Sequence, residues 1–148
     1  MHLDKIPTFA TAGLFHVVVE SPRGSSVKLK YPGTRASDGD SIDALIFSDA
    51  ATSPGVVVTC RALGVLEIDQ KKKTGDGRER NDRILAMPES ARRFDAMRDV
   101  FALPDRIRDE IAAFFIQATA FEDNDVQALG WQAPNRRSPC SGHLDHNW

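Results

Sequence analysis

Short apolar stretches separated by turn-forming or charged sequence occupy much of the first two thirds of the chain, as is typical of β-strands. Residues 14–20 are rich in β-branched side chains, and residues 27–31 alternate apolar residues with two lysines. Residues 42–47 and 84–87 are short apolar runs that adjoin turn-forming sequence. Each of these four stretches is predicted to be a strand.

The longest apolar run, residues 56–68, is too long for one flat strand. Gly64 lies in its middle, which indicates a β-bulge or the bend of a barrel. Residues 69–83 follow, with dense charge of both signs around Gly75 and Gly77, and they predict a long exposed hairpin or loop. The pattern therefore favours a closed or strongly curved sheet.

The hydrophobic period changes from two to that of a helix after Pro88. Residues 89–100 are predicted to form one short helix, and Pro104 to open a second. The second helix carries an apolar stripe that we expect to pack against the sheet. Its members are Ile107, Ile111, Phe114, Phe115 and Ala118.

Composition and length fit one soluble domain. The 148 residues are 41% hydrophobic and 27% charged, and we expect a single domain over 1–133 with a flexible tail over 134–148. A net charge of -2 gives no electrostatic reason to expect nucleic acid as a partner. No apolar run is long enough to span a bilayer, so we expect no membrane association. Two cysteines make no disulfide framework, Cys60 is expected in the core, and the cytoplasm is the predicted location.

Three carboxylates, Asp38, Asp40 and Asp43, occur within six residues just before an apolar run. Carboxylates so close repel one another, so a fold that gathers them needs a cation or positive side chains. An EF-hand loop does not fit, because Asp43 stands where that loop requires glycine. Taken locally, the stretch favours a solvated turn ahead of a strand.

Several stretches in one order resemble the soluble inorganic pyrophosphatases (family I). They read VVVESP, VKLKY, DGDSID, SPGVVVTCRALGVLEI, RILAMP and RDVFALPDRIRDEIAAFF. DGDSID is similar to the family signature D-(S/G/N)-D-P-x-D. The resemblance implies an α+β, mainly β fold: an OB-like β-barrel, here incomplete, with two helices packed on its side.

The resemblance also implies hydrolysis of inorganic diphosphate to two phosphates with Mg²⁺ as cofactor. Diphosphate is a compact polyanion, so its binding calls for hard cations and for Lys or Arg side chains. By position, Asp40 resembles the residue that holds or deprotonates the attacking water. The other implied site residues are the metal ligands Asp38, Asp43, Asp76 and Glu20 and the phosphate-binding residues Lys28 and Arg83. Asp76 fits a solvated loop equally well.

The chain departs from the family pattern around this site. Only PGTRAS lies between Tyr31 and Asp38, where the family has a long hairpin, and Asn81 stands where the family has a metal-binding aspartate. A Tyr-Lys pair is replaced by Ala118 and Thr119. Two functions stay open: a divergent Mg²⁺-dependent hydrolase, or a non-catalytic homologue that acts as a binding or scaffold subunit. Bacterial-type relatives also suggest a homo-oligomer.

Overall fold

The computed structural model describes residues 6–7, 9–11, 13–20, 29–30, 42–48, 51–120 and 123–134. These residues form an eight-stranded sheet, one α-helix and two short 3-10 turns. The strands are β1 (Phe9–Thr11), β2 (Leu14–Val19), β3 (Leu29–Lys30), β4 (Ala44–Ile46), β5 (Val57–Lys71), β6 (Arg78–Arg80), β7 (Arg83–Pro88) and β8 (Gln127–Gln132), and the helix is α1 (Asp105–Ala118).

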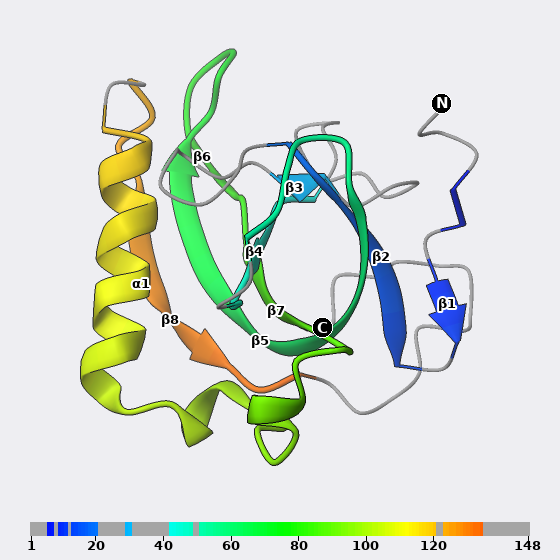
Figure 1. Ribbon diagram of the computed structural model, residues 1–148. Coiled ribbons are helices and arrows are strands. Elements are labelled where there is room, and N and C mark those ends of the chain that lie inside the picture. Colours follow the sequence, from blue (N-terminus) through cyan, green and yellow to red (C-terminus); the bar gives the residue numbers. More distant parts are fainter. Residues whose placement is uncertain are drawn as a thin grey trace.

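The sheet is mixed and strongly curved. Its main path runs β1-β2-β5-β7-β4, in which β4 and β7 are parallel and the other pairs antiparallel. β3 pairs with β2, and β6 and β8 pair with β5. In Figure 1 the strands surround a common interior, with β3 beside β4 at the top. Within the described residues no hydrogen-bonded ladder joins β3 to β4, so the barrel is not closed.

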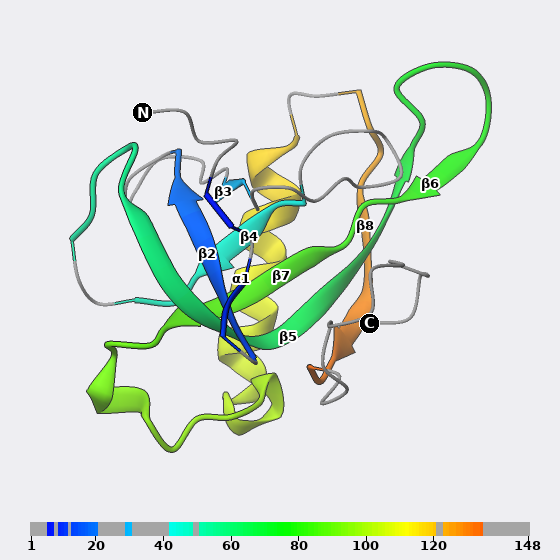
Figure 2. The same ribbon diagram turned by 90° about the vertical axis from the view of Figure 1, so that its right-hand side faces the viewer.

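β5 is one continuous strand that bends around the molecule (Figure 2). Its pairing with β7 shifts between Ala62 and Gly64, which face Ala86 and Leu85. One extra residue, Leu63, therefore bulges from β5, and a bulge increases the local bend of a strand. The bend predicted at Gly64 is confirmed.

The apolar core lies on both faces of β5 and β7, because side chains alternate along a strand. Cys60 is fully buried, as predicted, and burial raises the pKa of its thiol to about 12. The buried residues form three clusters: Phe15, Val17, Val19, Ala44, Cys60, Ile84 and Ala86; Leu63, Leu85, Met87, Val100 and Leu103; and Leu66, Ile68 and Phe115.

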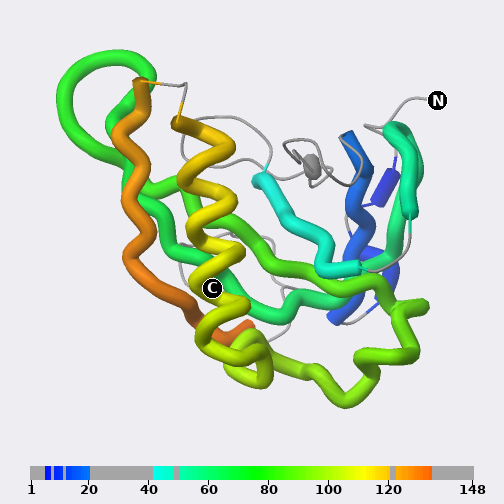
Figure 3. Tube along the Cα trace, turned by 60° about the vertical axis from the view of Figure 1, so that its left-hand side comes forward, coloured from blue at the N-terminus to red at the C-terminus, as the bar shows by residue number. Residues whose placement is uncertain are grey.

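α1 begins after Pro104, as predicted, and lies alongside β8 (Figure 3). Its buried stripe is narrower than the sequence suggested. Ile107, Ile111 and Phe115 pack against the core at four-residue spacing. Phe114 is 39% exposed and Ala118 is also exposed, because both lie off the line of the four-residue repeat that faces the sheet.

The short helix predicted over residues 89–100 does not form. Two 3-10 turns, Arg92–Phe94 and Val100–Ala102, lie in and just beyond this stretch. In the second turn, Asp99 caps the N-terminus by accepting a 2.6 Å hydrogen bond from the backbone N–H of Phe101. The prediction of two helices packed on the barrel is therefore corrected to one.

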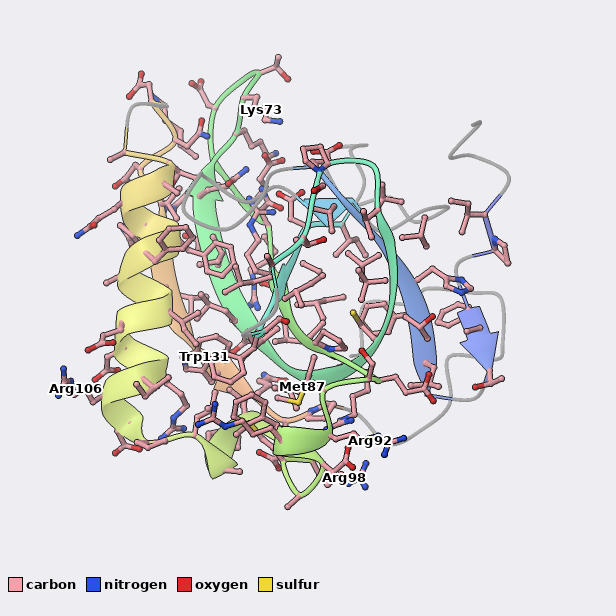
Figure 4. All side chains as sticks on the ribbon, in the orientation of Figure 1. Lys73, Met87, Arg92, Arg98, Arg106 and Trp131 are labelled. Carbon is pink, nitrogen blue, oxygen red and sulfur yellow. The ribbon has the colours of Figure 1, made fainter. Side chains whose placement is uncertain are left out.

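Arg61 supplies the physical reason for this difference. Its Nη2 donates to the backbone carbonyls of Phe94 at 2.9 Å and Met97 at 3.3 Å, and it lies 3.2 Å from Sδ of Met87. Figure 4 shows Met87 directly above the segment that carries Arg92 and Arg98. Carbonyls that bond to a side chain of β5 follow a path set by that strand instead of the regular ladder of a helix.

The predicted fold class, α+β and mainly β with an incomplete barrel, otherwise agrees with the observed sheet. The strands predicted at 14–20, 42–47, 56–68 and 84–87 are present, and the charged stretch forms the β5–β6 hairpin. β1 and β8 were not predicted. No helix among the described residues is long and apolar enough to cross a membrane. The tail over 134–148 lies almost wholly outside the described residues, so it stays a prediction.

Candidate functional site

Parallel pairing of β4 with β7 brings a carboxylate and a guanidinium together. Ala44 pairs with Ile84, and the backbone N–H of Ile84 donates to the carbonyl of Asp43 at 3.1 Å. Ala44 and Ile84 face the core, so the residues just before them, Asp43 and Arg83, face the opposite side of the sheet. Burial of the apolar side chains of Ala44 and Ile84 thus sets the register that makes Asp43 and Arg83 neighbours.

Asp43 and Arg83 form an ion pair in which Nη1 of Arg83 lies 2.7 Å from Oδ2 of Asp43. Their side chains are only 19% and 13% exposed. Water therefore screens this pair weakly, and removing one partner would leave a charge with little solvent around it. Such a loss typically costs about 3 kcal/mol or more of unfolding free energy.

Two buried amides continue this pair into a polar network. Nη1 of Arg83 also donates to Oδ1 of Asn81 at 2.8 Å, and Nδ2 of Asn81 donates to Oε1 of Gln70 at 3.0 Å. Nε2 of Gln70 donates to Oε1 of Glu79 at 3.2 Å. Gln70 and Asn81 are 2% and 8% exposed, so each amide depends on its partners in the network for hydrogen bonds.

Exposed ion pairs hold the neighbouring β5–β6 hairpin. Arg80 contacts Glu67 at 2.6 Å and Asp82 at 3.0 Å, and the hydrogen bond from Arg80 lowers the pKa of Glu67. Arg78 contacts Asp69 and, at 2.6 Å, Asp125. Asp125 lies just before β8. Exposed pairs of this kind each contribute little to stability, because water screens their charges.

The remaining predicted site residues are spread over the fold. Glu20 follows β2 and is half-buried, and Asp76 lies at the exposed turn between β5 and β6. Gly75 and Gly77, on either side of Asp76, have positive φ angles of 80° and 102°, which form this turn. Lys28, Asp38 and Asp40 lie outside the described residues, so their predicted roles stay predictions.

Gln70 is a site residue that sequence reasoning missed, although a signal was present. In β5, Leu66, Ile68 and Gln70 share one face, and all three are buried. A polar side chain that continues an alternating apolar face marks a buried hydrogen-bonding position. Asn81 was noted only as a departure from the family pattern, and its bond to Arg83 was not foreseen.

Comparisons with known proteins agree on one family. The model of the protein family described as "Inorganic pyrophosphatase" matches residues 30–138. An inorganic pyrophosphatase of a Synechocystis strain is 30% identical, over 89% of this chain and 90% of the relative. The chain belongs to the inorganic pyrophosphatase family. A Thermus thermophilus relative with the same name is 29% identical, over 87% of this chain and 84% of its own.

Solved structures of inorganic pyrophosphatases have the same fold. That from Thermus thermophilus superposes with a TM-score of 0.78 at 25% identity and covers 90% of both chains. That from Coxiella burnetii gives 0.75 at 20% identity and covers 86% of this chain and 90% of its own. The alignment with the Synechocystis pyrophosphatase spans 158 positions, more than the 148 residues here, so this pyrophosphatase-family chain is shortened.

The oxygen atoms near Arg83 are of a kind that suits magnesium. Carboxylate and amide oxygens are hard ligands of the type that Mg²⁺ prefers, and Asp43 and Asn81 provide one of each. Within the described part of the chain, no three His, Cys, Asp or Glu side chains are grouped so that they could hold a metal ion. Of the aspartates in the predicted cluster only Asp43 lies in that part of the chain, so the magnesium site stays a prediction.

Proposed function

We propose that this protein hydrolyses inorganic diphosphate to two phosphates with Mg²⁺ as its cofactor. Membership of the inorganic pyrophosphatase family is the observation that carries the proposal. The pairing of Asp43 with Arg83 supports it, because diphosphate hydrolysis needs both a carboxylate that can bind a hard cation and a fixed positive charge for phosphate oxygens.

Asp38 and Asp43 would hold Mg²⁺ in this proposal, with Glu20 and Asp76 as ligands of further ions. When bound, Mg²⁺ neutralises phosphate charge and lowers the pKa of a coordinated water. In the proposed reaction a water oxygen would attack one phosphorus atom while the bond from that atom to the bridging oxygen breaks, and the second phosphate would leave with that oxygen. Asp40 holds the water and accepts its proton.

Two basic side chains would bind the substrate. Lys28 and Arg83 would contact phosphate oxygens, and a guanidinium can place two N–H groups on one phosphate. Two departures from the family pattern, Asn81 in place of an aspartate and the short segment in place of a hairpin, should slow this reaction. Each contact that is lost to the transition state lowers the rate. We therefore expect a measurable but reduced rate compared with relatives that keep the family pattern.

Phosphate release from diphosphate with Mg²⁺ tests the proposal. Asp40→Asn should reduce the rate about a hundredfold or more, since it removes a proton acceptor. Asp109→Asn is a matched control, because Asp109 is exposed on α1 and undergoes the same chemical change. Chelation should abolish the activity of the wild type, and added Mg²⁺ should restore it.

Two results would contradict the hydrolase proposal. One is equal rates for the wild type and a folded Asp40→Asn variant. The other is no release from a folded wild type supplied with Mg²⁺, which would favour the non-catalytic scaffold alternative. The cytoplasmic location and the homo-oligomer stay predictions, and light scattering of the purified protein tests the latter.

A further inference from the structure

A continuous line of hydrogen bonds connects Asp43 to Glu79 through three side chains. Arg83 donates to Asn81, Asn81 donates to Gln70, and Gln70 donates to Glu79. Each amide accepts from one neighbour and donates to the next. From Arg83 to Glu79 the hydrogen bonds therefore run in one direction, from a cationic donor to an anionic acceptor, and the charges of Arg83 and Glu79 polarise the two amides in the same sense.

The geometry keeps the guanidinium of Arg83 on Asp43. One nitrogen, Nη1, lies 2.7 Å from the carboxylate of Asp43 and donates to the amide oxygen of Asn81. Asn81 cannot turn without breaking its bond to Gln70, and both amides are at least 92% buried. Arg83 is therefore held by the neutral amide of Asn81, itself bonded to Gln70, and this amide does not compete with Asp43 for the charge of Arg83.

We propose that Arg83 is the resident counter-ion of Asp43 and that Asn81 and Gln70 are positioning residues that hold it there. A divalent cation that binds Asp43 must then share the carboxylate with a guanidinium already in contact with it. This arrangement weakens cation binding at this edge of the site. The inference rests on the proposed function only for its meaning in catalysis, since the ion pair and the network exist without substrate.

Mn²⁺ titration of the full chain by calorimetry and by paramagnetic resonance of free Mn²⁺, without diphosphate, tests the counter-ion role. Arg83→Gln should bind Mn²⁺ about tenfold or more tightly than the wild type, because a positive charge next to Asp43 is removed. Arg98→Gln is a matched control with the same change in net charge. Arg98 is exposed and lies at the lower edge of the molecule in Figure 4. The affinity of this variant should equal that of the wild type.

Unchanged or weaker Mn²⁺ binding by Arg83→Gln would overturn the counter-ion role. The same holds if neither it nor the wild type binds Mn²⁺. Arg83→Lys keeps a positive charge and should stay close to the wild type. If Arg83→Gln does not fold, Asn81→Leu decides, because this variant retains the charge of Arg83 and only releases it from its support.

A double-mutant cycle tests the positioning role of Asn81. Asn81→Leu should tighten Mn²⁺ binding roughly threefold, and adding Arg83→Gln should give no more than Arg83→Gln alone, because Asn81 acts through Arg83. A purely structural role would lower thermal stability and leave Mn²⁺ affinity unchanged, and that result, or additive effects, would overturn positioning.

The Mn²⁺ titrations and the phosphate-release assay can refute the two proposals separately. A wild type that releases no phosphate contradicts the proposed function and leaves the comparison of Mn²⁺ affinities valid. An active wild type whose Arg83→Gln variant binds Mn²⁺ no more tightly overturns only the counter-ion inference.

Discussion

Gly64 lies where three segments of the chain converge, and replacing it with alanine should destabilise the fold. A Cβ added there would lie 2.7 Å from both Cβ and Cγ1 of Val100 and 2.7 Å from the backbone carbonyl oxygen of Gln132. Val100 is fully buried, and β8, which contains Gln132, is hydrogen-bonded to β5. Neither neighbour can move without disturbing packing or a strand pair.

The expected magnitude follows from overpacking. Contacts below 3.0 Å force backbone or side-chain shifts that typically cost 1–3 kcal/mol, and we expect the free energy of unfolding to fall by about 2 kcal/mol. The backbone of Gly64 is not in the left-handed region, so alanine there adds no φ strain and would otherwise be slightly stabilising. The melting temperature should fall by roughly 4–8 °C for a chain of this size.

Urea unfolding followed by circular dichroism measures this loss, and a second substitution tests its cause. Val100→Ala removes the crowding Cγ1, so the double variant should be more stable than the sum of the two single losses by about 0.5 kcal/mol or more. A Gly64→Ala protein within about 0.5 kcal/mol of the wild type would refute the packing argument. Simple additivity would show that Cγ1 of Val100 is not the obstacle, since Val100→Ala retains Cβ.

Three further predictions follow from buried and paired side chains. Because the pKa of Cys60 is about 12 in the folded protein and 9.0 ordinarily, its contribution to stability is complete below pH 9. This contribution to the free energy of unfolding falls by up to about 1.4 kcal/mol per pH unit as the pH rises toward 12. Urea unfolding of the wild type at a series of pH values should show this decrease, and the Cys60→Ala variant should lack the part that Cys60 causes. Phe115→Ala should lower the unfolding free energy by about 3 kcal/mol, whereas Phe114→Ala, the exposed neighbouring control, should cost about 1 kcal/mol or less; equal losses would contradict the packing of α1. Arg80→Gln should raise the pKa of Glu67 toward its ordinary range in a carboxyl NMR titration, and an unchanged pKa would show that the hydrogen bond is not its cause.

Much of the fold could be predicted from local pattern. Apolar and β-branched runs located four strands, Gly64 marked the bend in β5, and Pro104 marked the start of α1. These signals are readable because each depends on neighbours a few residues away. The failed helix over 89–100 shows the limit: its apolar spacing is helical, but Arg61, about 30 residues earlier, binds two of its backbone carbonyls.

The candidate site divides in the same way. The sequence by itself determined which residues carry charge, how closely Asp38, Asp40 and Asp43 follow one another, and which family the chain resembles. Only the tertiary structure decided that Asp43 meets Arg83 and that Gln70 and Asn81 support the guanidinium. The register of β4 on β7 is set by burial of side chains in a shared core, and strands forty residues apart in sequence carry no local signal of that register.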